Sequence, residues 1–355
     1  MSVERADVLV VGLGPAGSCA AAAAARAGAR VIAVDRRHEP GLPVQCAEFV
    51  PALIGIETGA LAGAVRQSIA SMMTFVEDEA PDLTDPFPGK MLDRAAFDAA
   101  LVREAAGAGA QCRFATTVRK IGANARVMLA EGAVIEAAVI VGADGPRSVA
   151  GRAIKQVNAA LVETRQVTVP LLRAHDATDI FLSASIPGGY GWLFPKGPIA
   201  NLGAGVDPAH RQRLRGIVQR LHSSLVASGR VGPEVLNVTG GAIPVGGMLI
   251  PHAQLGSSHV LLAGDAAGLA NPVTGAGIAA AVYSGKLAGE AAGAIVRGDR
   301  GAARAYEEEL RDVLGVALDR AVRRRAELTR ATAGGAGRDA LRRGWIAYPQ
   351  YWATP

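Results

Sequence analysis

The chain has 355 residues, which is enough for one large domain or two ordinary domains with full cores. Half of the residues are apolar, yet only 4% are aromatic and 44 are glycines, a composition that suits tightly packed α/β layers. The formal net charge of +5 is too small to indicate a nucleic-acid partner. It is compatible with a phosphate-bearing cofactor or an anionic membrane surface.

The three cysteines, Cys19, Cys46 and Cys112, lie far apart and show no metal-ligand spacing, so we expect no metal site. No signal peptide precedes the first motif, and no uninterrupted apolar run reaches transmembrane length. We therefore expect a cytoplasmic protein with reduced thiols.

The first recognisable unit covers residues 6–36. Residues 6–11 are apolar and rich in β-branched side chains, which predicts a buried strand. The segment Gly12-Leu13-Gly14-Pro15-Ala16-Gly17 follows at once, and then an alanine-rich helix to about residue 27. A second strand over residues 30–34 ends in Asp35-Arg36. This order of strand, glycines, helix, strand and acid predicts a dinucleotide-binding βαβ unit.

Each part of this unit has a physical role in binding a dinucleotide. Gly12 permits a tight turn, Gly14 lets the backbone approach a pyrophosphate, and Gly17 lets helix and strand pack closely. The helix N-terminus offers unpaired N–H groups and a positive dipole end to the phosphates. Asp35 can accept hydrogen bonds from the ribose hydroxyls.

The rest of the chain alternates between helical and strand-like segments. Helices are predicted over 94–108, 209–227 and 275–296, and strands over 72–77, 111–118, 126–130, 134–141 and 260–263, with a strand-rich stretch over 166–206. A discontinuous cofactor domain is expected over 1–66, 91–153 and 252–298, with a substrate domain over 67–90 and 154–251. A basic helical tail is expected over 299–355.

Two further glycine–acid motifs follow predicted strands. Asp265, in Gly264-Asp265, could bond the ribityl chain of a flavin, or could serve only as an N-cap-like acid. The helix that opens at Gly277-Ile278 would direct its N-terminal N–H groups at a ligand, and its dipole would stabilise the anion of a reduced flavin. The other motif is Gly142-Ala143-Asp144-Gly145.

In this order, the three motifs resemble the glutathione-reductase-type FAD proteins, as arranged in aromatic hydroxylases and prenyl reductases. The resemblance implies an α/β fold with a Rossmann-like FAD-binding domain, an inserted antiparallel-sheet substrate domain and a helical C-terminal tail. It also implies pyrophosphate, ribose, adenine, ribityl and flavin contacts from the matching positions, which are Gly12, Gly14, Ala16, Gly17, Asp35, Arg36, Cys46, Ala47, Arg94, Val118, Asp144, Asp265, Gly277 and Ile278.

Two other stretches narrow the resemblance to the geranylgeranyl reductase family. The segment from Tyr190 to Lys196 resembles that family's Y-x-W-x-F-P-K sequence. Cys46, ten residues after Arg36, falls where those reductases carry a cysteine beside the flavin. The family usually continues with glycines, whereas this chain has Ala47-Glu48-Phe49, a departure that bears on the local backbone path.

The residue types allow two interpretations at each of these positions. Tyr190, Trp192 and Phe194 would share one face of a strand, where they could line an apolar substrate pocket or simply pack in a core. Cys46 could donate a proton to the substrate after hydride transfer, or it could be an inert small hydrophobe.

The leading interpretation is an FAD-dependent oxidoreductase that reduces C=C bonds of an isoprenoid-like or other apolar substrate. The alternative is a flavin-dependent monooxygenase that acts through a flavin hydroperoxide, with a halogenase and a non-catalytic flavin-binding maturation factor as lesser alternatives. The electron source would be NAD(P)H or a reduced ferredoxin-like donor. No second dinucleotide fingerprint is present.

The C-terminal tail suggests a peripheral contact with the inner face of the membrane. Its apolar and aromatic end, residues 345–352, could lie at the headgroup level, or it could fold back over the substrate domain. The basic residues that would support such a contact are Arg320, Arg323, Arg324, Arg325, Arg330, Arg338, Arg342 and Arg343.

Overall fold

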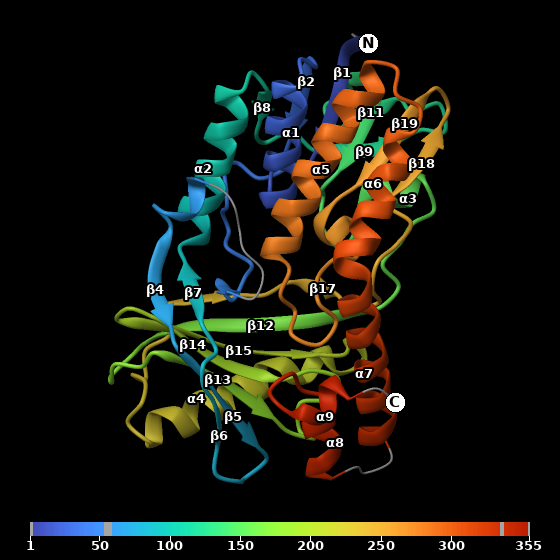
Figure 1. Ribbon diagram of the computed structural model, residues 1–355. Coiled ribbons are helices and arrows are strands. Elements are labelled where there is room, and N and C mark those ends of the chain that lie inside the picture. Colours follow the sequence, from blue (N-terminus) through green and yellow to red (C-terminus); the bar gives the residue numbers. More distant parts are fainter. Residues whose placement is uncertain (1–2, 53–58, 334–336, 354–355) are drawn as a thin grey trace.

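The computed structural model describes residues 3–52, 59–333 and 337–353. The parts of the predicted cofactor domain and tail that fall on residues 1–2, 53–58, 334–336 and 354–355 lie outside the described residues. Two eight-stranded sheets and one three-stranded sheet make up the β-structure described. Figure 1 shows the first sheet with its helices at one end of the molecule and the second sheet crossing below it. The mixed α/β class predicted from the sequence is confirmed.

The first sheet has a parallel centre. Its strand order is β18 (His252–Leu255), β19 (Ser258–Leu262), β11 (Val134–Gly142), β1 (Val3–Val11), β2 (Val31–Val34) and β8 (Gln111–Arg113). The strands β9 (Val118–Ile121) and β10 (Val127–Leu129) extend it in antiparallel fashion beside β11. The single strand expected over 111–118 is wrong, because Ala115 takes a left-handed conformation (φ +52°) and separates β8 from β9.

Two helices cover one face of this sheet and approach each other closely. They are α1 (Pro15–Arg26) and α5 (Ile278–Val296), and three glycines spaced four residues apart on α5 face α1. A Cβ placed on Gly285 would lie 2.1 Å from the Ala16 carbonyl oxygen, and one on Gly289 would lie 2.3 Å from that of Ala20. Only glycine permits this contact between the two backbones.

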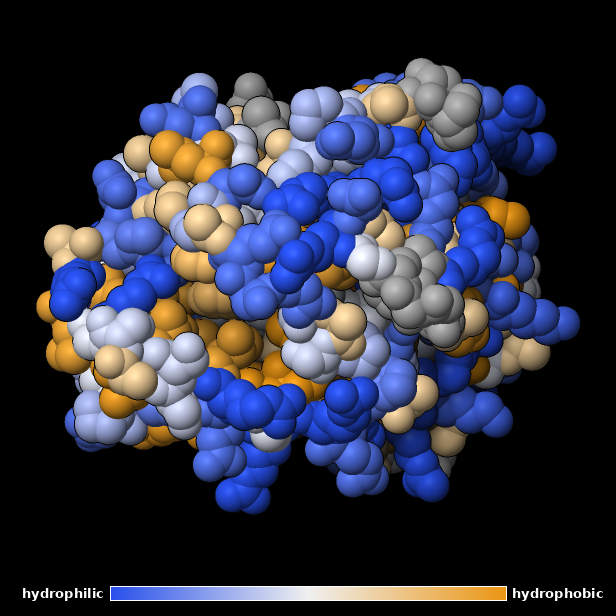
Figure 2. All heavy atoms as spheres, turned by 90° about the horizontal axis from the view of Figure 1, so that it is seen from below, coloured by the Kyte–Doolittle hydropathy of each residue, from blue (hydrophilic) through white to orange (hydrophobic). Residues whose placement is uncertain are grey.

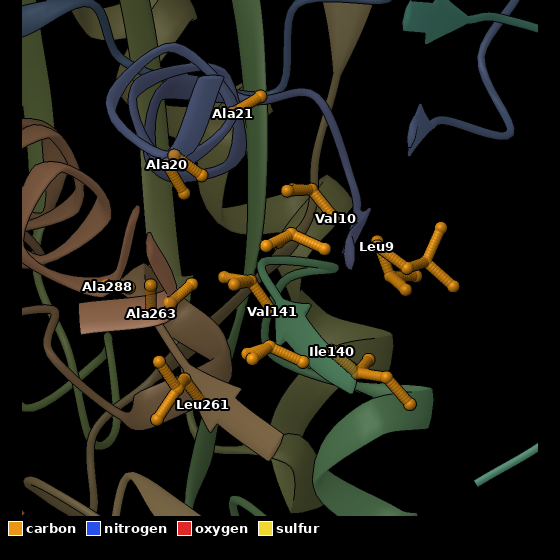
Figure 3. Close-up of a cluster of buried hydrophobic side chains, with 14 of the residues drawn as sticks. Leu9, Val10, Ala20, Ala21, Ile140, Val141, Leu261, Ala263 and Ala288 are labelled. Carbon is orange, nitrogen blue, oxygen red and sulfur yellow. The ribbon is translucent and has the colours of Figure 1, made fainter. Parts of the chain in front are cut away.

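The core between the helices and the sheet is built from small and branched side chains. Figure 3 shows this cluster, in which residues of β1, β11 and the β19 region, among them Val10, Val141 and Leu261, lie with the alanines of α1 and α5. Val10, Val141 and Leu261 are fully buried. The alanine-rich composition therefore serves a thin, dense layer rather than a bulky core.

The second sheet is built from residues of the predicted substrate domain, and we call it the substrate sheet. Its order is β16 (Asn237–Thr239), β12 (Leu161–Pro170), β15 (Ile199–Val206), β14 (Gly191–Lys196), β13 (Ala177–Leu182), β5 (Ser71–Val76) and β6 (Asp82–Thr84), with β17 (Ala242–Pro244) beside β12. The pairing is antiparallel as expected, except that β5 and β13 are parallel. The helix α4 (Leu214–Ala227) packs on one face of this sheet. A 3-10 helix, Pro208–Arg213, precedes α4, so the helix expected from residue 209 begins later.

Short elements connect the two large sheets. The strands β3 (Phe49–Pro51), β7 (Gly89–Leu92) and β4 (Val65–Ile69) form the three-stranded sheet, and α2 (Arg94–Gly107) follows β7. A small helix, α3 (Val149–Ala153), follows β11. Both α2 and α3 begin close to the carboxyl edge of the first sheet, where the predicted motifs lie.

The C-terminal tail is helical and folds back on the substrate sheet. It contains α6 (Ala302–Leu310), a π-helical turn (Arg311–Gly315), α7 (Val316–Ala333), α8 (Arg338–Arg343) and α9 (Pro349–Trp352). Trp345 and Tyr351 are buried, whereas Trp352 is 53% exposed. The expectation that the whole aromatic end reaches the headgroup level is therefore wrong for Trp345 and Tyr351, because both pack inside the protein.

Figure 2 shows the end of the molecule that carries the substrate sheet, with hydrophilic residues over most of it and hydrophobic residues lining a hollow. None of the helices in the described part of the chain is both long and apolar enough to cross a bilayer.

The α1–α5 contact predicts that alanine substitutions at two helical glycines change the free energy of unfolding in opposite directions. Gly289→Ala should lower the free energy of unfolding by about 2 kcal/mol, because its Cβ would overlap the Ala20 carbonyl. Gly107→Ala, in α2, meets no atom within 4 Å and should raise it by about 0.5 kcal/mol through helix propensity. Thermal and denaturant unfolding of both variants would test the contact, and equal effects would contradict it.

Candidate functional site

The predicted glycine–acid motifs meet at the carboxyl edge of the first sheet. The strands β1, β11 and β19 are neighbours, and the chain leaves each of them in register. The Ala143 amide donates to the Val11 carbonyl at 2.8 Å, and the Ala263 amide donates to the Gly142 carbonyl at 2.9 Å. Ligands of open α/β sheets bind at this edge. The structure thus brings the three separate motifs into one site.

The turn after β1 is closely packed on one side and open on the other. Gly12 has φ +96°, and a Cβ there would lie 2.4 Å from the Ala143 carbonyl oxygen. A Cβ on Gly17 would lie 1.8 Å from the Gly12 carbonyl oxygen. By contrast, no atom lies within 4 Å of the Cβ position of Gly14, so space is open beside this turn. Ala16 and Gly17 follow in the first turn of α1, whose N-terminal amides face the same edge.

Asp35 lies at the end of β2, beside the first turn. The residue is 7% exposed, and its carboxylate accepts from the Leu13 amide at 2.7 Å and the Arg37 amide at 2.8 Å. A carboxylate has about four acceptor positions, so two backbone donors leave capacity for ribose hydroxyls. The Thr116 amide donates to the Asp35 carbonyl at 2.8 Å, which places the segment leading to Val118 next to this acid. Arg36 is exposed.

Asp144 is occupied by its own loop. Its carboxylate accepts from the Ser148 hydroxyl and the Val149 amide, both at 2.5 Å, at the start of α3. Burial raises the pKa of Asp144, and these hydrogen bonds oppose the rise. The side chain therefore organises the loop after β11, and its contact with a cofactor stays a prediction.

Asp265 faces the N-terminus of α5. A Cβ on Gly277, the N-cap of α5, would lie 3.2 Å from Asp265 Oδ1, so the carboxylate borders the first turn of that helix. Burial raises the pKa of Asp265 to about 6, and the positive charge of Arg94 opposes this rise. The carboxylate of Asp265 and the guanidinium of Arg94 thus act on each other across the site, although they belong to different segments.

Arg94 and Cys46 form the other side of the site. Arg94 opens α2 and makes two 3.1 Å hydrogen bonds to Asp98. Burial alone would lower the pKa of Arg94, but Asp98 and Cys46 beside it hold that pKa above its ordinary value. The sulfur of Cys46 accepts a hydrogen bond from the Glu48 amide at 3.2 Å. Ile278 of α5 packs in the same apolar cluster as Cys46.

The other two cysteines have different surroundings. Burial raises the pKa of the Cys19 thiol to about 12, and burial also raises the pKa of Cys112. Cys19 lies on α1, and Cys112 lies on β8. Both suit packing rather than proton transfer.

The aromatic residues of β14, and Tyr190 just before it, lie on the face of the substrate sheet that packs against the loop with Cys46 and Ala47. Trp192 and Phe194 are buried, and the half-buried Tyr190 donates its hydroxyl to the Thr274 carbonyl at 2.5 Å. Tyr190 and Trp345 have ring centroids 4.8 Å apart, so the C-terminal tail covers this cluster. Ala47 packs against it, one residue away from Cys46. The loop that carries the Cys46 thiol therefore also contacts the aromatic cluster, through Ala47.

Sequence reasoning missed the polar residues that hold this loop, above all Glu48. Glu48 is 4% exposed, and its carboxylate accepts from the Arg94 amide at 3.0 Å, Lys196 Nζ at 2.5 Å and Asn201 Nδ2 at 2.8 Å. Gln166 donates to the Cys46 carbonyl at 3.2 Å and accepts from the Trp192 indole at 3.1 Å. The loop is thereby tied to both α2 and the substrate sheet.

Glu48 is also one of the residues at which this chain departs from the glycines usual in the family. Its backbone has φ +70°, a conformation that glycine favours and that costs a glutamate strain. Three hydrogen bonds to its buried carboxylate hold the residue there. The signal in the sequence was a charged residue at a position where the family usually has glycine.

The raised pKa of Asp265 predicts a pH dependence. Because the folded-state pKa, about 6, exceeds the ordinary value of 3.8, the flavin-free protein should lose about 2 kcal/mol of stability as pH rises from 4 to 7. Asp265→Asn should remove this loss and, by our assignment, also weaken FAD binding. Unfolding at several pH values and FAD titration measure the two effects. The exposed Asp312→Asn is the control, and a variant with full FAD affinity would contradict the assignment.

Glu48→Gln tests the buried ionic cluster. An amide offers one acceptor oxygen to three donors and leaves Lys196 without its countercharge, so unfolding free energy should fall by about 3 kcal/mol. Glu136→Gln, which breaks exposed ion pairs with Arg5 and Arg126, should cost under about 1 kcal/mol. If denaturant unfolding shows similar losses of stability for the two variants, the cluster around Glu48 stabilises the protein no more than exposed ion pairs do.

Comparison with known proteins agrees with this geometry. Residues 7–171 match the family described as lycopene cyclase protein. Digeranylgeranylglycerophospholipid reductase of Methanothrix thermoacetophila is 34% identical over 345 residues, covering 89% of this chain and 85% of that protein.

Solved structures share the fold. A geranylgeranyl bacteriochlorophyll reductase-like protein of Thermoplasma acidophilum superposes with a TM-score of 0.79 at 24% identity, covering 99% of this chain and 98% of that one. A probable FAD-dependent monooxygenase of Pseudomonas aeruginosa gives 0.67 at 16% identity, covering 95% and 98%. The resemblance drawn from the motifs is confirmed, and the chain belongs to the geranylgeranyl reductase family, together with its relatives named digeranylgeranylglycerophospholipid reductase.

Proposed function

We propose that this protein is an FAD-dependent reductase that saturates C=C bonds in the geranylgeranyl chains of a glycerophospholipid. One juxtaposition carries the proposal: Arg94, Cys46 and Asp265 converge between a dinucleotide-binding edge and an enclosed aromatic cluster. The substrate class is taken from the names of the relatives, which are digeranylgeranylglycerophospholipid reductases.

The residues at the carboxyl edge suit FAD. The turn with Gly12 and Gly14, together with the start of α1, would hold the pyrophosphate, and Asp35 would bind the adenosine ribose. Asp265 would accept from the ribityl chain, and the N-terminus of α5 would lie at the pyrimidine edge of the flavin. When bound and reduced, FAD supplies the hydride.

Cys46 is our candidate for the proton donor. Saturation of a C=C bond needs one hydride and one proton, and Cys46 Sγ would release the proton to the substrate carbon. The Glu48 amide, which donates to that sulfur, and the positive charge of Arg94 would stabilise the thiolate that remains. The positive charge would also favour negative charge on the reduced cofactor beside it.

The aromatic cluster would receive the isoprenoid chain. Tyr190, Trp192 and Phe194 present apolar surface on the cofactor side of the sheet, and the tail covers that surface with Trp345 and Leu341. Burial of an apolar chain against these rings is favourable and keeps water from the reacting carbon. For a substrate to enter, the tail helix α8 would have to move outward.

The electron source and the location of the protein complete the proposal. We assign NAD(P)H or a reduced ferredoxin-like protein as a donor that binds transiently, since the chain has one dinucleotide fingerprint. We place the protein in the cytoplasm, at the inner face of the membrane that contains its lipid substrate.

One experiment separates this function from oxygenation, the activity of the monooxygenases that share the fold. The purified protein with FAD is reduced anaerobically and mixed either with a digeranylgeranyl lipid or with air. Lipid-dependent reoxidation of the flavin, with saturated product in the mass spectrum, supports the reductase. A hydroxylated product that forms only with air would contradict it.

Cys46 variants test the proton donor. Cys46→Ala should retain FAD and lower kcat about 100-fold, since general acid catalysis contributes roughly 10²–10⁴. Cys46→Ser should lose less, because a hydroxyl can still pass a proton. Cys112→Ala, away from the site, should match the wild type. If the two Cys46 variants both turn over at the wild-type rate, the thiol serves packing alone.

A further inference from the structure

One segment of the substrate domain carries only positive charge. Residues 208–230, which cover the 3-10 helix before α4, α4 itself and the turn after it, contain five arginines, two histidines and no aspartate or glutamate. The whole chain has a formal net charge of +5. The excess charge of this one segment therefore equals that of the entire protein.

Four of these arginines have no partner among the residues that the structure describes. Arg211, Arg213, Arg215 and Arg220 are exposed, and their side chains make no hydrogen bond or ion pair with any described residue. The fifth, Arg230, pairs with Asp179. We call the four unpaired arginines the α4 basic face. Two of them, Arg211 and Arg213, lie on the 3-10 helix, and Arg215 and Arg220 lie on α4. Unpaired exposed cations on two consecutive elements are available to an external anionic surface.

The arginines of the tail differ from those of the α4 basic face. Arg324 donates to the Tyr351 carbonyl and pairs with Glu327, and Arg325 donates to Gly188 and Asp207. Arg338 and Arg342 pair with the acids of the β5–β6 turn. These four tail cations are neutralised within the protein, so the positive patch seen in the tail sequence is largely cancelled by folding.

Exposed aliphatic side chains lie near the C-terminal end of α4, whereas the α4 basic face lies toward its N-terminal end. The Leu172 amide donates to the Arg230 carbonyl, and the Leu236 amide donates to the Thr168 carbonyl, so the chain after α4 runs back along the edge of β12. Along this edge Leu172 is 58% exposed, Leu236 47% and Val235 44%. Basic residues toward one end of a helix and exposed aliphatic residues near its other end can both contact the surface of an anionic bilayer.

The position of α4 decides between two kinds of anionic partner. The helix packs on the face of the substrate sheet opposite Trp192, Gln166 and Asn201, whose side chains face the Cys46 loop. A neighbouring layer packs about 10 Å from a sheet, so both the sheet and α4 would separate the cofactor from a donor protein docked there. A lipid surface needs no such proximity.

We propose that the α4 basic face, together with the exposed aliphatic residues near the C-terminal end of α4, binds the surface of a bilayer that contains anionic phospholipid. This inference deepens the proposed function and rests on it, because the proposed substrate is a membrane lipid. It assigns the membrane contact to α4 rather than to the C-terminal tail. Binding is electrostatic, so it weakens with salt.

The test is cosedimentation of the full-length protein with vesicles of phosphatidylcholine alone or with 30% phosphatidylglycerol, a fraction of about this size being enough to charge the surface. The α4 variant replaces Arg211, Arg213, Arg215 and Arg220 with glutamine. The matched control, called the cofactor-domain variant, replaces Arg26, Arg103 and Arg119 of that domain and Arg300, which follows it directly. All four are exposed, so the same charge is removed. A third variant replaces the exposed tail residues Arg323, Arg330 and Arg343.

The α4 variant should bind anionic vesicles at least about 20-fold more weakly than the wild type at low salt, since each basic residue near the surface contributes about fivefold. The cofactor-domain and tail variants should stay within about threefold. Equal losses in all variants, loss only in the tail variant, or unchanged binding of the α4 variant would each overturn the proposal. So would an α4 variant that binds vesicles normally but is reduced more slowly by a ferredoxin.

The readout is independent of the reductase assignment. FAD content and the reduction of a geranylgeranyl lipid dispersed in neutral detergent should be unchanged in the α4 variant, because no α4 arginine touches the candidate site. If the wild type fails to reduce that lipid while the vesicle results hold, the proposed function fails and the docking surface stands. If reduction holds and vesicle binding does not depend on α4, only the surface is wrong.

Discussion

The contact between α1 and α5 is the constraint on which the site depends. Gly285 and Gly289 let the backbones of the two helices touch, with Cβ positions that would overlap the carbonyls of Ala16 and Ala20. The two helix N-termini consequently open at one edge of the first sheet, near the turn with Gly12 and near Asp265. Two positive dipole ends at one edge are what a cofactor with a pyrophosphate and an anionic reduced ring requires.

The second constraint is the buried carboxylate of Glu48. It joins the start of α2 to the substrate sheet and holds the loop that carries Cys46. A buried ionic cluster adds little net stability compared with apolar packing, but removing one member leaves an uncompensated charge. This arrangement favours a single position of the Cys46 loop, at the cost of strain at Glu48. It therefore couples the geometry of the candidate thiol to the placement of the substrate sheet.

The first βαβ unit and the glycine–acid motifs could be predicted from the sequence because their signals are local. Each motif combines a strand, a turn and a helix within about 30 residues, and the physical role of each glycine follows from that order. The edge between β8 and β9, the parallel pairing of β5 with β13 and the start of α4 could not be predicted in this way. They depend on a left-handed residue or on pairing between distant segments.

The sequence by itself determined the α/β class and the family, since these rest on residue type and spacing. Only the tertiary structure decided which charges are neutralised and which remain available. Glu48 finds its partners 46, 148 and 153 residues away along the chain, and Arg325 finds Asp207 118 residues away. The arginines of α4 find none among the described residues. Charge pairing at such separations depends on how the chain folds back on itself, which no local pattern encodes.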